Sequence, residues 1–159
     1  MNENNLEKII NNIVGDAIVK EVMSLKLAVK LIETVEEKAA EMGLAVVVAV
    51  SDASGRPVAV LCMDGAYHGS FDVAVNKTYT STAFQMSTAK LSRLCQPGQD
   101  LYGLQFSNNG KVMILGGGEP LMVGRTMIGA LGVSGGSAQE DSDLAAYGAS
   151  ALKEVIKCL

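Results

Sequence analysis

A chain of 159 residues with 48% hydrophobic and 19% charged residues has the size and composition of one globular domain with a real core. The net charge of −4 and the lack of any Lys/Arg cluster argue against a nucleic-acid surface. No apolar run approaches the roughly 20 residues that a membrane-spanning helix needs.

The start of the chain, "MNENNLEK", lacks the basic patch and apolar core of a secretory signal. Three widely spaced cysteines, Cys62, Cys95 and Cys158, indicate neither a disulfide framework nor a zinc site. We therefore expect a cytoplasmic protein with reduced thiols.

The first 22 residues predict an amphipathic helix that is separate from a main domain over residues 23–159. The apolar stripe of this helix consists of Leu6, Ile9, Ile10, Ile13, Val14, Ala17 and Ile18. Such a helix is marginal alone in water and must dock on something. It is either an extra helix packed on its own domain or in a dimer, or a detachable peptide that docks in a partner's groove.

Residues 24–42 predict a second amphipathic helix, capped by Ser24 and ended by Gly43. Its expected buried face consists of Leu25, Ala28, Ile32, Val35, Ala39 and Met42. Two β-branched runs follow at residues 44–50 and 57–63, and the turn "SDASGR" joins them into a hairpin.

Residues 71–94 predict a helix with Ser70 as its cap. The helix is rich in Thr and Ser, which are weak helix formers, so tertiary packing must hold it. The next segment, residues 95–111, predicts a loop with short turns. Its length indicates that it covers a site or an interface.

Residues 112–115, 119–123 and 127–133 predict three further strands, with a tight turn at Gly124 and Arg125. "SAQE" at 137–140 is a capping box that opens a last helix. The apolar face of this helix consists of Leu144, Ala151, Leu152, Val155 and Leu159. The order helix-β-β-helix-β-β-β-helix indicates an α+β, profilin-like domain with a five-stranded antiparallel sheet flanked by helices.

The glycines of this region have two interpretations. Gly116 to Gly118 join two strands without a following helix, so they are no nucleotide fingerprint. "VSGGS", which contains Gly135, precedes a helix start whose N–H groups could bind a carboxylate or phosphate. The alternative is turn geometry plus capping, because Asp141 and Asp143 already complement the helix dipole.

The only histidine, His68, lies in a loop between two glycines. It is a candidate metal or haem ligand, a candidate general base, or a surface residue, and Tyr67 is a second possible haem ligand. Asp64 and Lys77 are candidates for acid/base work. Alternatively, Asp64 orders the loop and Lys77 is a charge on the surface of a helix.

Two stretches, "VVAVSDASGRPVAVLCMDGAYHGSFDVAVNKTYTSTAF" and "GGGEPLMVGRTMIGALGVSGGSAQEDSDLAAYG", resemble the GlcG/HbpS-like family, which includes the C-terminal domain of PduO-type proteins. The resemblance covers roughly residues 24–157. It implies a five-stranded antiparallel sheet between helices and a symmetric homo-oligomer. It also implies haem as a cofactor, or a corrinoid as the alternative.

The resemblance implies cofactor-binding residues at Asp64, Gly65, Ser70, Gly116, Gly117, Gly118, Pro120 and Gly135, and the ligand chemistry of Tyr67 and His68 adds these two candidates. It implies that glycine-rich hairpins let the backbone approach a pocket or a neighbouring subunit. The sequence departs from the family pattern at Tyr67 and His68.

The N-terminal stretch is similar to peptides that direct cargo into bacterial microcompartments for propanediol or ethanolamine metabolism. Its expected partner-binding residues are Leu6, Ile9, Ile10, Ile13, Val14 and Ile18. The sequence thus predicts an accessory cofactor-binding protein in a microcompartment lumen. The alternatives are a small enzyme acting on a hydroxy- or oxo-acid, with Asp64, His68 and Lys77 as its catalytic groups, and a structural oligomer without ligand.

Overall fold

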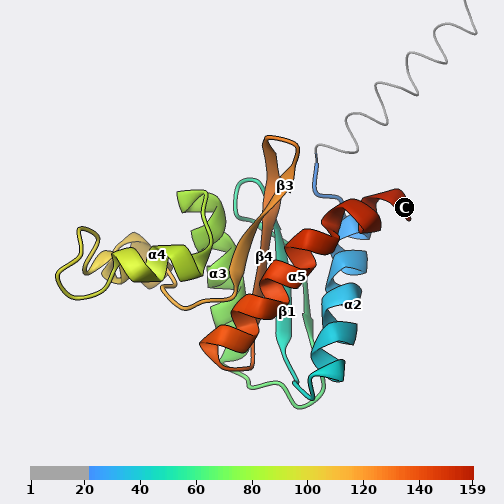
Figure 1. Ribbon diagram of the computed structural model, residues 1–159, viewed down its shortest axis with the longest axis horizontal. Coiled ribbons are helices and arrows are strands. Elements are labelled where there is room, and N and C mark those ends of the chain that lie inside the picture. Colours follow the sequence, from blue (N-terminus) through green and yellow to red (C-terminus); the bar gives the residue numbers. More distant parts are fainter. Residues whose placement is uncertain (1–21) are drawn as a thin grey trace, which may run out of the picture.

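A computed structural model describes residues 22–159 of the chain (Figure 1). The predicted N-terminal helix lies outside the described residues. The described elements, in chain order, are α2 (Leu25–Glu41), β1 (Val47–Asp52), β2 (Pro57–Cys62), α3 (Ser70–Phe84), α4 (Thr88–Leu94), β3 (Gly118–Val123), β4 (Thr126–Ser134) and α5 (Ala138–Lys157). No helix in this part of the chain has the length and hydropathy needed to cross a membrane.

The sheet has four strands in the order β2-β1-β4-β3, and every neighbouring pair is antiparallel. The α+β class and the hairpin of β1 with β2 are therefore confirmed, whereas the prediction of five strands is wrong. Residues 112–115 form no strand because they contact α3 and α4 instead of a neighbouring strand. The N–H of Met113 donates to Thr80 Oγ1 on α3 at 2.8 Å, and Val112 packs in a small cluster with Leu91 and Cys95.

The sheet is covered on both faces, which explains why the first five residues of β1, Val47 to Ser51, are all buried (Figure 1). Val48 and Val50 belong to the main core with residues of α2 and α5. Val47 and Ala49 point to the opposite face and pack with Ala74 of α3. The molecule therefore has three layers, with α2 and α5 on one side of the sheet and α3 on the other.

The predicted helix ends are partly confirmed. Ser24 Oγ accepts from the N–H of Leu27, and the capping box of Ser137 and Glu140 forms at the start of α5. Ser70 is not the cap of α3, because it is the first residue of the helix and Gly69 precedes it as the N-cap.

The predicted helix over residues 71–94 is two helices, α3 and α4. Gln85 has a left-handed backbone with φ 53°, which ends α3, and Ser87 then caps α4 by accepting from the N–H of Lys90. Beyond α4, the predicted loop contains two short 3-10 turns, Leu104–Phe106 and Asn108–Gly110. Together with α4 this loop forms a lobe that projects from the three-layered body (Figure 1).

Three predicted core positions are exposed instead. Leu25 is 62% exposed, Met42 is 40% exposed and Leu159 is 43% exposed. On α2 the buried positions include Leu27 and Leu31, so its buried face is rotated relative to the predicted one. Leu25 and Leu159 lie at the same end of the molecule, where the C-terminus meets the start of α2 (Figure 1).

Glycine allows two close approaches between layers. A Cβ at Gly132 of β4 would collide with the carbonyl oxygen of Ala74 on α3, and a Cβ at Gly148 of α5 would collide with Leu131 and Val35. The helices lie this close to the sheet only because these positions have no side chain.

We predict that Gly148→Ala lowers the free energy of unfolding by about 1 kcal/mol or more, because an added methyl overpacks the core between Leu131 and Val35. Urea unfolding measures this change. Gly69→Ala is the matched control, since nothing lies within 4 Å of the Cβ it would add. Equal midpoints for the two variants would contradict the prediction.

Candidate functional site

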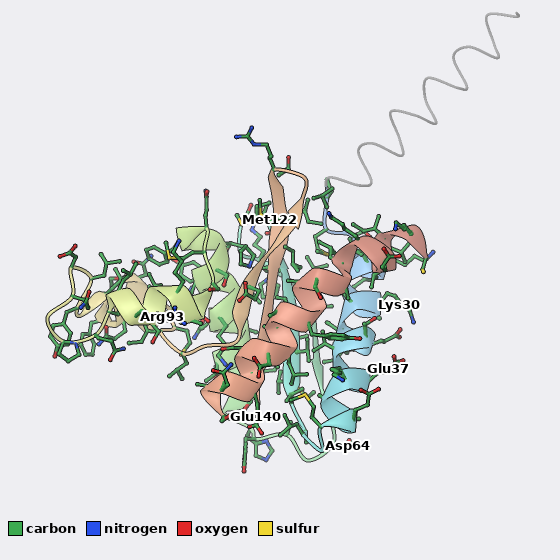
Figure 2. All side chains as sticks on the ribbon, in the orientation of Figure 1. Lys30, Glu37, Asp64, Arg93, Met122 and Glu140 are labelled. Carbon is green, nitrogen blue, oxygen red and sulfur yellow. The ribbon has the colours of Figure 1, made fainter. Side chains whose placement is uncertain are left out.

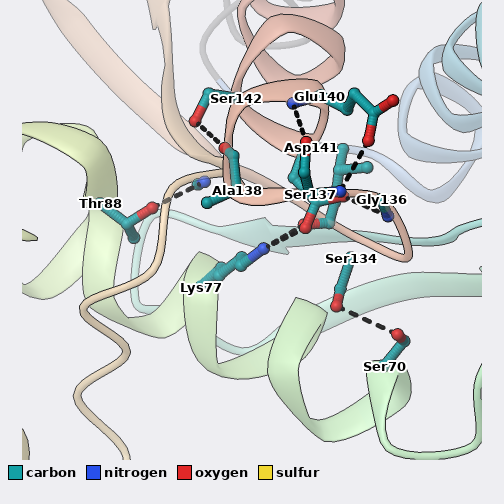
Figure 3. Close-up of polar contacts among 12 residues, drawn as sticks. Ser70, Lys77, Thr88, Ser134, Gly136, Ser137, Ala138, Glu140, Asp141 and Ser142 are labelled. Carbon is teal, nitrogen blue, oxygen red and sulfur yellow. Dashed lines mark hydrogen bonds and ion pairs between the residues drawn. The ribbon is translucent and has the colours of Figure 1, made fainter.

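The centre of the molecule contains a buried ion pair between α3 and α5 (Figure 3). Lys77 Nζ donates to Asp141 Oδ2 at 2.8 Å and to the backbone carbonyl of Val133 at 2.6 Å. The side chains are only 1% and 5% exposed. One lysine thus joins α3, the end of β4 and the first turn of α5.

The second carboxylate oxygen of Asp141 organises the turn before α5. Asp141 Oδ1 accepts from the N–H of Gly136 at 2.9 Å, and Glu140 accepts from the N–H of Ser137 at 2.7 Å (Figure 3). These two N–H groups are therefore satisfied within the chain. Turn geometry plus capping is confirmed at "VSGGS".

Of the two interpretations of Lys77, the one that makes it a charge on the surface of a helix is wrong. Burial lowers the pKa of Lys77 from its usual 10.5, and the hydrogen bond and the charge of Asp141 oppose that shift. Ala74, Lys77, Thr78 and Ser81 recur at helical spacing and are all buried on α3, but only Ala74 is apolar, so apolar periodicity does not predict the burial of Lys77. The sequence also gives no signal for its partner Asp141.

The triple glycine lies against this ion pair. A Cβ at Gly117 would lie 2.7 Å from the Cβ of Asp141 and 2.8 Å from Lys77 Nζ. Gly117 also has φ 112°, and the N–H of Gly118 donates to Thr88 Oγ1 at 2.9 Å (Figure 3). Gly116 to Gly118 therefore give the backbone the close approach to the chain's own helices that the buried pair requires.

The remaining candidates, Gly135 and Pro120, lie just after β4 and within β3. Gly135 lies against the backbone of Ala45 and Val46. Pro120 is half-buried on β3, opposite Ala130 of β4. Within residues 22–159, neither residue forms a hydrogen bond with the loop of His68.

The loop between β2 and α3 gathers Asp64, Gly65, Tyr67 and His68, and all four are exposed. Tyr67 is 73% exposed, and Phe71, the second residue of α3, is 45% exposed. Figure 2 shows Asp64 at the end of the molecule where this loop lies. The loop and the start of α3 therefore expose an imidazole and two aromatic rings.

Ser70 anchors this loop to the sheet. Its hydroxyl lies 3.1 Å from Ser134 Oγ at the end of β4, and both serines are buried (Figure 3). Of the three predicted acid/base groups, Asp64 and His68 share the exposed loop, while Lys77 is buried two turns into α3 with internal partners. Among residues 22–159, no group of three or more His, Cys, Asp or Glu could hold a metal ion.

The protein is an α+β domain with a four-stranded antiparallel sheet and a buried ion pair packed against Gly117. Residues 23–150 match the family described as haem-degrading protein HbpS-like. The chain belongs to this family, as the two sequence stretches predict.

Two curated relatives are similar to the chain. A 15.0 kDa protein from the dhaT–dhaS intergenic region of Citrobacter freundii is 39% identical over 77% of this chain and 87% of that protein. The corrinoid adenosyltransferase PduO of Salmonella typhimurium strain LT2 is 39% identical over 69% of this chain, but the match spans only 32% of PduO.

Two solved structures share the fold. The Klebsiella pneumoniae protein ORFY is 36% identical with a TM-score of 0.80, and the match covers 82% of this chain and 90% of that one. The complex of PduOC with haem is 35% identical with a TM-score of 0.78, covering 82% of this chain and 94% of that one.

We predict that Lys77→Met lowers the free energy of unfolding by about 3–5 kcal/mol, because the buried Asp141 carboxylate loses its charge partner. Chemical denaturation measures the loss. Lys157→Met is the control, since its pair with Glu154 is fully exposed and should not affect the midpoint.

A double variant, Lys77→Met with Asp141→Asn, removes both charges and keeps an oxygen that can accept from the N–H of Gly136. It should be more stable than Lys77→Met alone, because no unpaired charge remains buried. A double variant no more stable than the single one would contradict an energetic role for the ion pair.

Proposed function

We propose that this protein is an accessory haem-binding protein and that His68 is the axial ligand. The observation that supports this most is the exposed imidazole of His68, which follows the exposed Tyr67 in the same loop and precedes the exposed Phe71 at the start of α3. Imidazole and phenolate are both haem ligands, and aromatic rings pack on a flat macrocycle. Membership of an HbpS-like family and the similarity to PduOC, solved with haem, agree with the proposal.

The residues of the loop fit a haem in donor type and in access. His68 offers a nitrogen ligand, Tyr67 is the neighbouring alternative, and Asp64 is a nearby polar group. A bound haem supplies an iron centre whose chemistry is set by its axial ligands. The chain's own contribution is to hold that ligand at a loop fixed by Ser70 and Ser134.

The exposure of this loop favours a site completed by a second protomer. With one histidine per chain, ligation by two imidazoles requires two chains. Large apolar residues are also exposed on the projecting lobe, among them Tyr102 and Phe106, at 64% and 82%. We therefore include a homo-oligomer in the proposal.

We predict that added haem gives the full-length protein a Soret band distinct from that of free haem. His68→Ala should weaken haem binding by at least about tenfold, which corresponds to 1.4 kcal/mol. Titration followed by absorbance measures both effects. A spectrum that stays that of free haem would count against the proposal.

Matched controls separate the possible ligands. Tyr67→Phe keeps the ring and removes the hydroxyl, so it should preserve the band if His68 is the ligand. Asp72→Ala, on the exposed surface of α3 close to the loop, should also leave the band unchanged. A parallel titration with cobalamin tests the corrinoid alternative, and spectral changes with cobalamin alone would favour it.

We also propose that residues 1–22 direct the protein into a bacterial microcompartment. The apolar stripe of Leu6, Ile9, Ile10, Ile13, Val14 and Ile18 and the similarity to PduO support this. A lumenal location within the cytoplasm would follow.

We predict that residues 1–20 fused to a fluorescent protein co-purify with microcompartment shells. The same fusion carrying Ile10→Asp should not, because a charge interrupts the apolar stripe. Fluorescence of purified shells measures the difference. Uniform cytoplasmic fluorescence of both fusions would refute the cargo proposal.

A further inference from the structure

The main body has an apolar groove beside the point where the described chain begins. It has a volume of about 610 Å³, and its lining includes Leu25, Val29, Cys158 and Leu159, with Lys26 and Lys30 at its sides. Figure 2 shows Lys30 on the outward side of α2, and Figure 1 shows the C-terminus next to the first turns of that helix. Lys26 Nζ donates to the carbonyl of Leu159 at 3.2 Å, which holds the two walls together.

Two leucines that the sequence pattern predicts to be buried line the groove instead. Leu25 lies on the predicted apolar face of α2. Leu159 belongs to the predicted apolar face of the last helix but follows the end of α5 at Lys157, and the two leucines are 62% and 43% exposed. Val22, just before the groove, is 54% exposed. Three large apolar residues in one place, two of them lining the same groove, indicate a surface that another apolar element covers.

We infer that the apolar stripe of the chain's own residues 6–18 docks in this groove. The stripe is apolar, as are Leu25, Val29 and Leu159 in the groove, and it is marginal in water as an isolated helix. Met23 is buried in the main core, so the chain enters α2 from a fixed point next to the groove.

The connection between stripe and groove is short enough for this arrangement. Residues 19–24 give six residues between Ile18 and the start of α2 at Leu25, within the range of about 2–8 that joins neighbouring helices. An antiparallel arrangement places Ile18 near Leu25 and Val14 near Val29. Val14 then lies close to Cys158, which lines the same groove.

Docking in the groove goes beyond the proposed function and does not depend on haem. The same stripe cannot contact a microcompartment shell while it covers Leu25 and Val29. The groove therefore competes with an external partner for residues 6–18, and it shields their apolar side chains until that partner is present.

Cys158 provides the test in the full-length protein. Cys62→Ser removes the other exposed thiol, and Cys95 is buried. In that background we compare Val14→Cys with Asn12→Cys, which lies almost opposite Val14 on a helix. Glutathione disulfide oxidises the thiols, and mass spectrometry of tryptic peptides measures the disulfide to Cys158. We expect it to form at least about tenfold faster from Val14→Cys, a ratio that corresponds to 1.4 kcal/mol.

A second test places a charge in the groove, which should prevent docking of the apolar stripe. Adding Val29→Asp to the Val14→Cys protein should reduce the rate to that of Asn12→Cys. Ala40→Asp, an exposed position on α2 outside the groove, should not. Thermal unfolding checks that both remain folded. Equal rates from the two cysteine positions, no effect of Val29→Asp, or disulfides mainly between two chains would overturn the inference.

Because the experiment uses purified protein without shells or haem, its failure would leave the cargo and haem proposals to their own tests.

Discussion

The structure depends on the buried contact of Lys77 with Asp141 and the carbonyl of Val133. A charged lysine inside a domain is tolerated only when its charge and its hydrogen bonds are satisfied. That requirement constrains three segments. α5 must begin where Asp141 can reach α3, β4 must place the carbonyl of Val133 beside Lys77, and the segment that passes the pair must be glycine. Gly117 meets the last condition because any side chain would occupy the space of the pair. The glycine-rich segment thus serves the ion pair.

The exposed loop of Tyr67 and His68 is attached to buried elements near the ion pair. The loop leaves β2, and α3 begins at Ser70, whose hydroxyl pairs with Ser134 one residue beyond Val133. The loop and the ion pair are therefore attached to the same end of β4 and to the same helix. A ligand bound by His68 would be held by a fixed part of the domain, although the ring itself is open to solvent or to a second chain.

The apolar groove lies at the start of α2, away from the loop of Tyr67 and His68. The walls of the groove are apolar and come from two distant parts of the chain, the start of α2 and the last residues after α5. A haem-binding loop at one end and a docking groove at the other would let the N-terminal stripe change its partner without disturbing the ligand. Both features use surfaces that the central ion pair does not need.

The sequence by itself determined the α+β class, the β1–β2 hairpin, the caps at Ser24 and Ser137 and the family, because these follow from local periodicity, capping chemistry and motif spacing. Only the tertiary structure decided the number of strands and the break between α3 and α4. Met113 donates to Thr80 instead of to a neighbouring strand, and Gln85 adopts a left-handed backbone that its residue type does not announce. The pairing of Lys77 with Asp141 also required the structure. The two residues are 64 positions apart, and no local pattern specifies which carboxylate a buried lysine will meet.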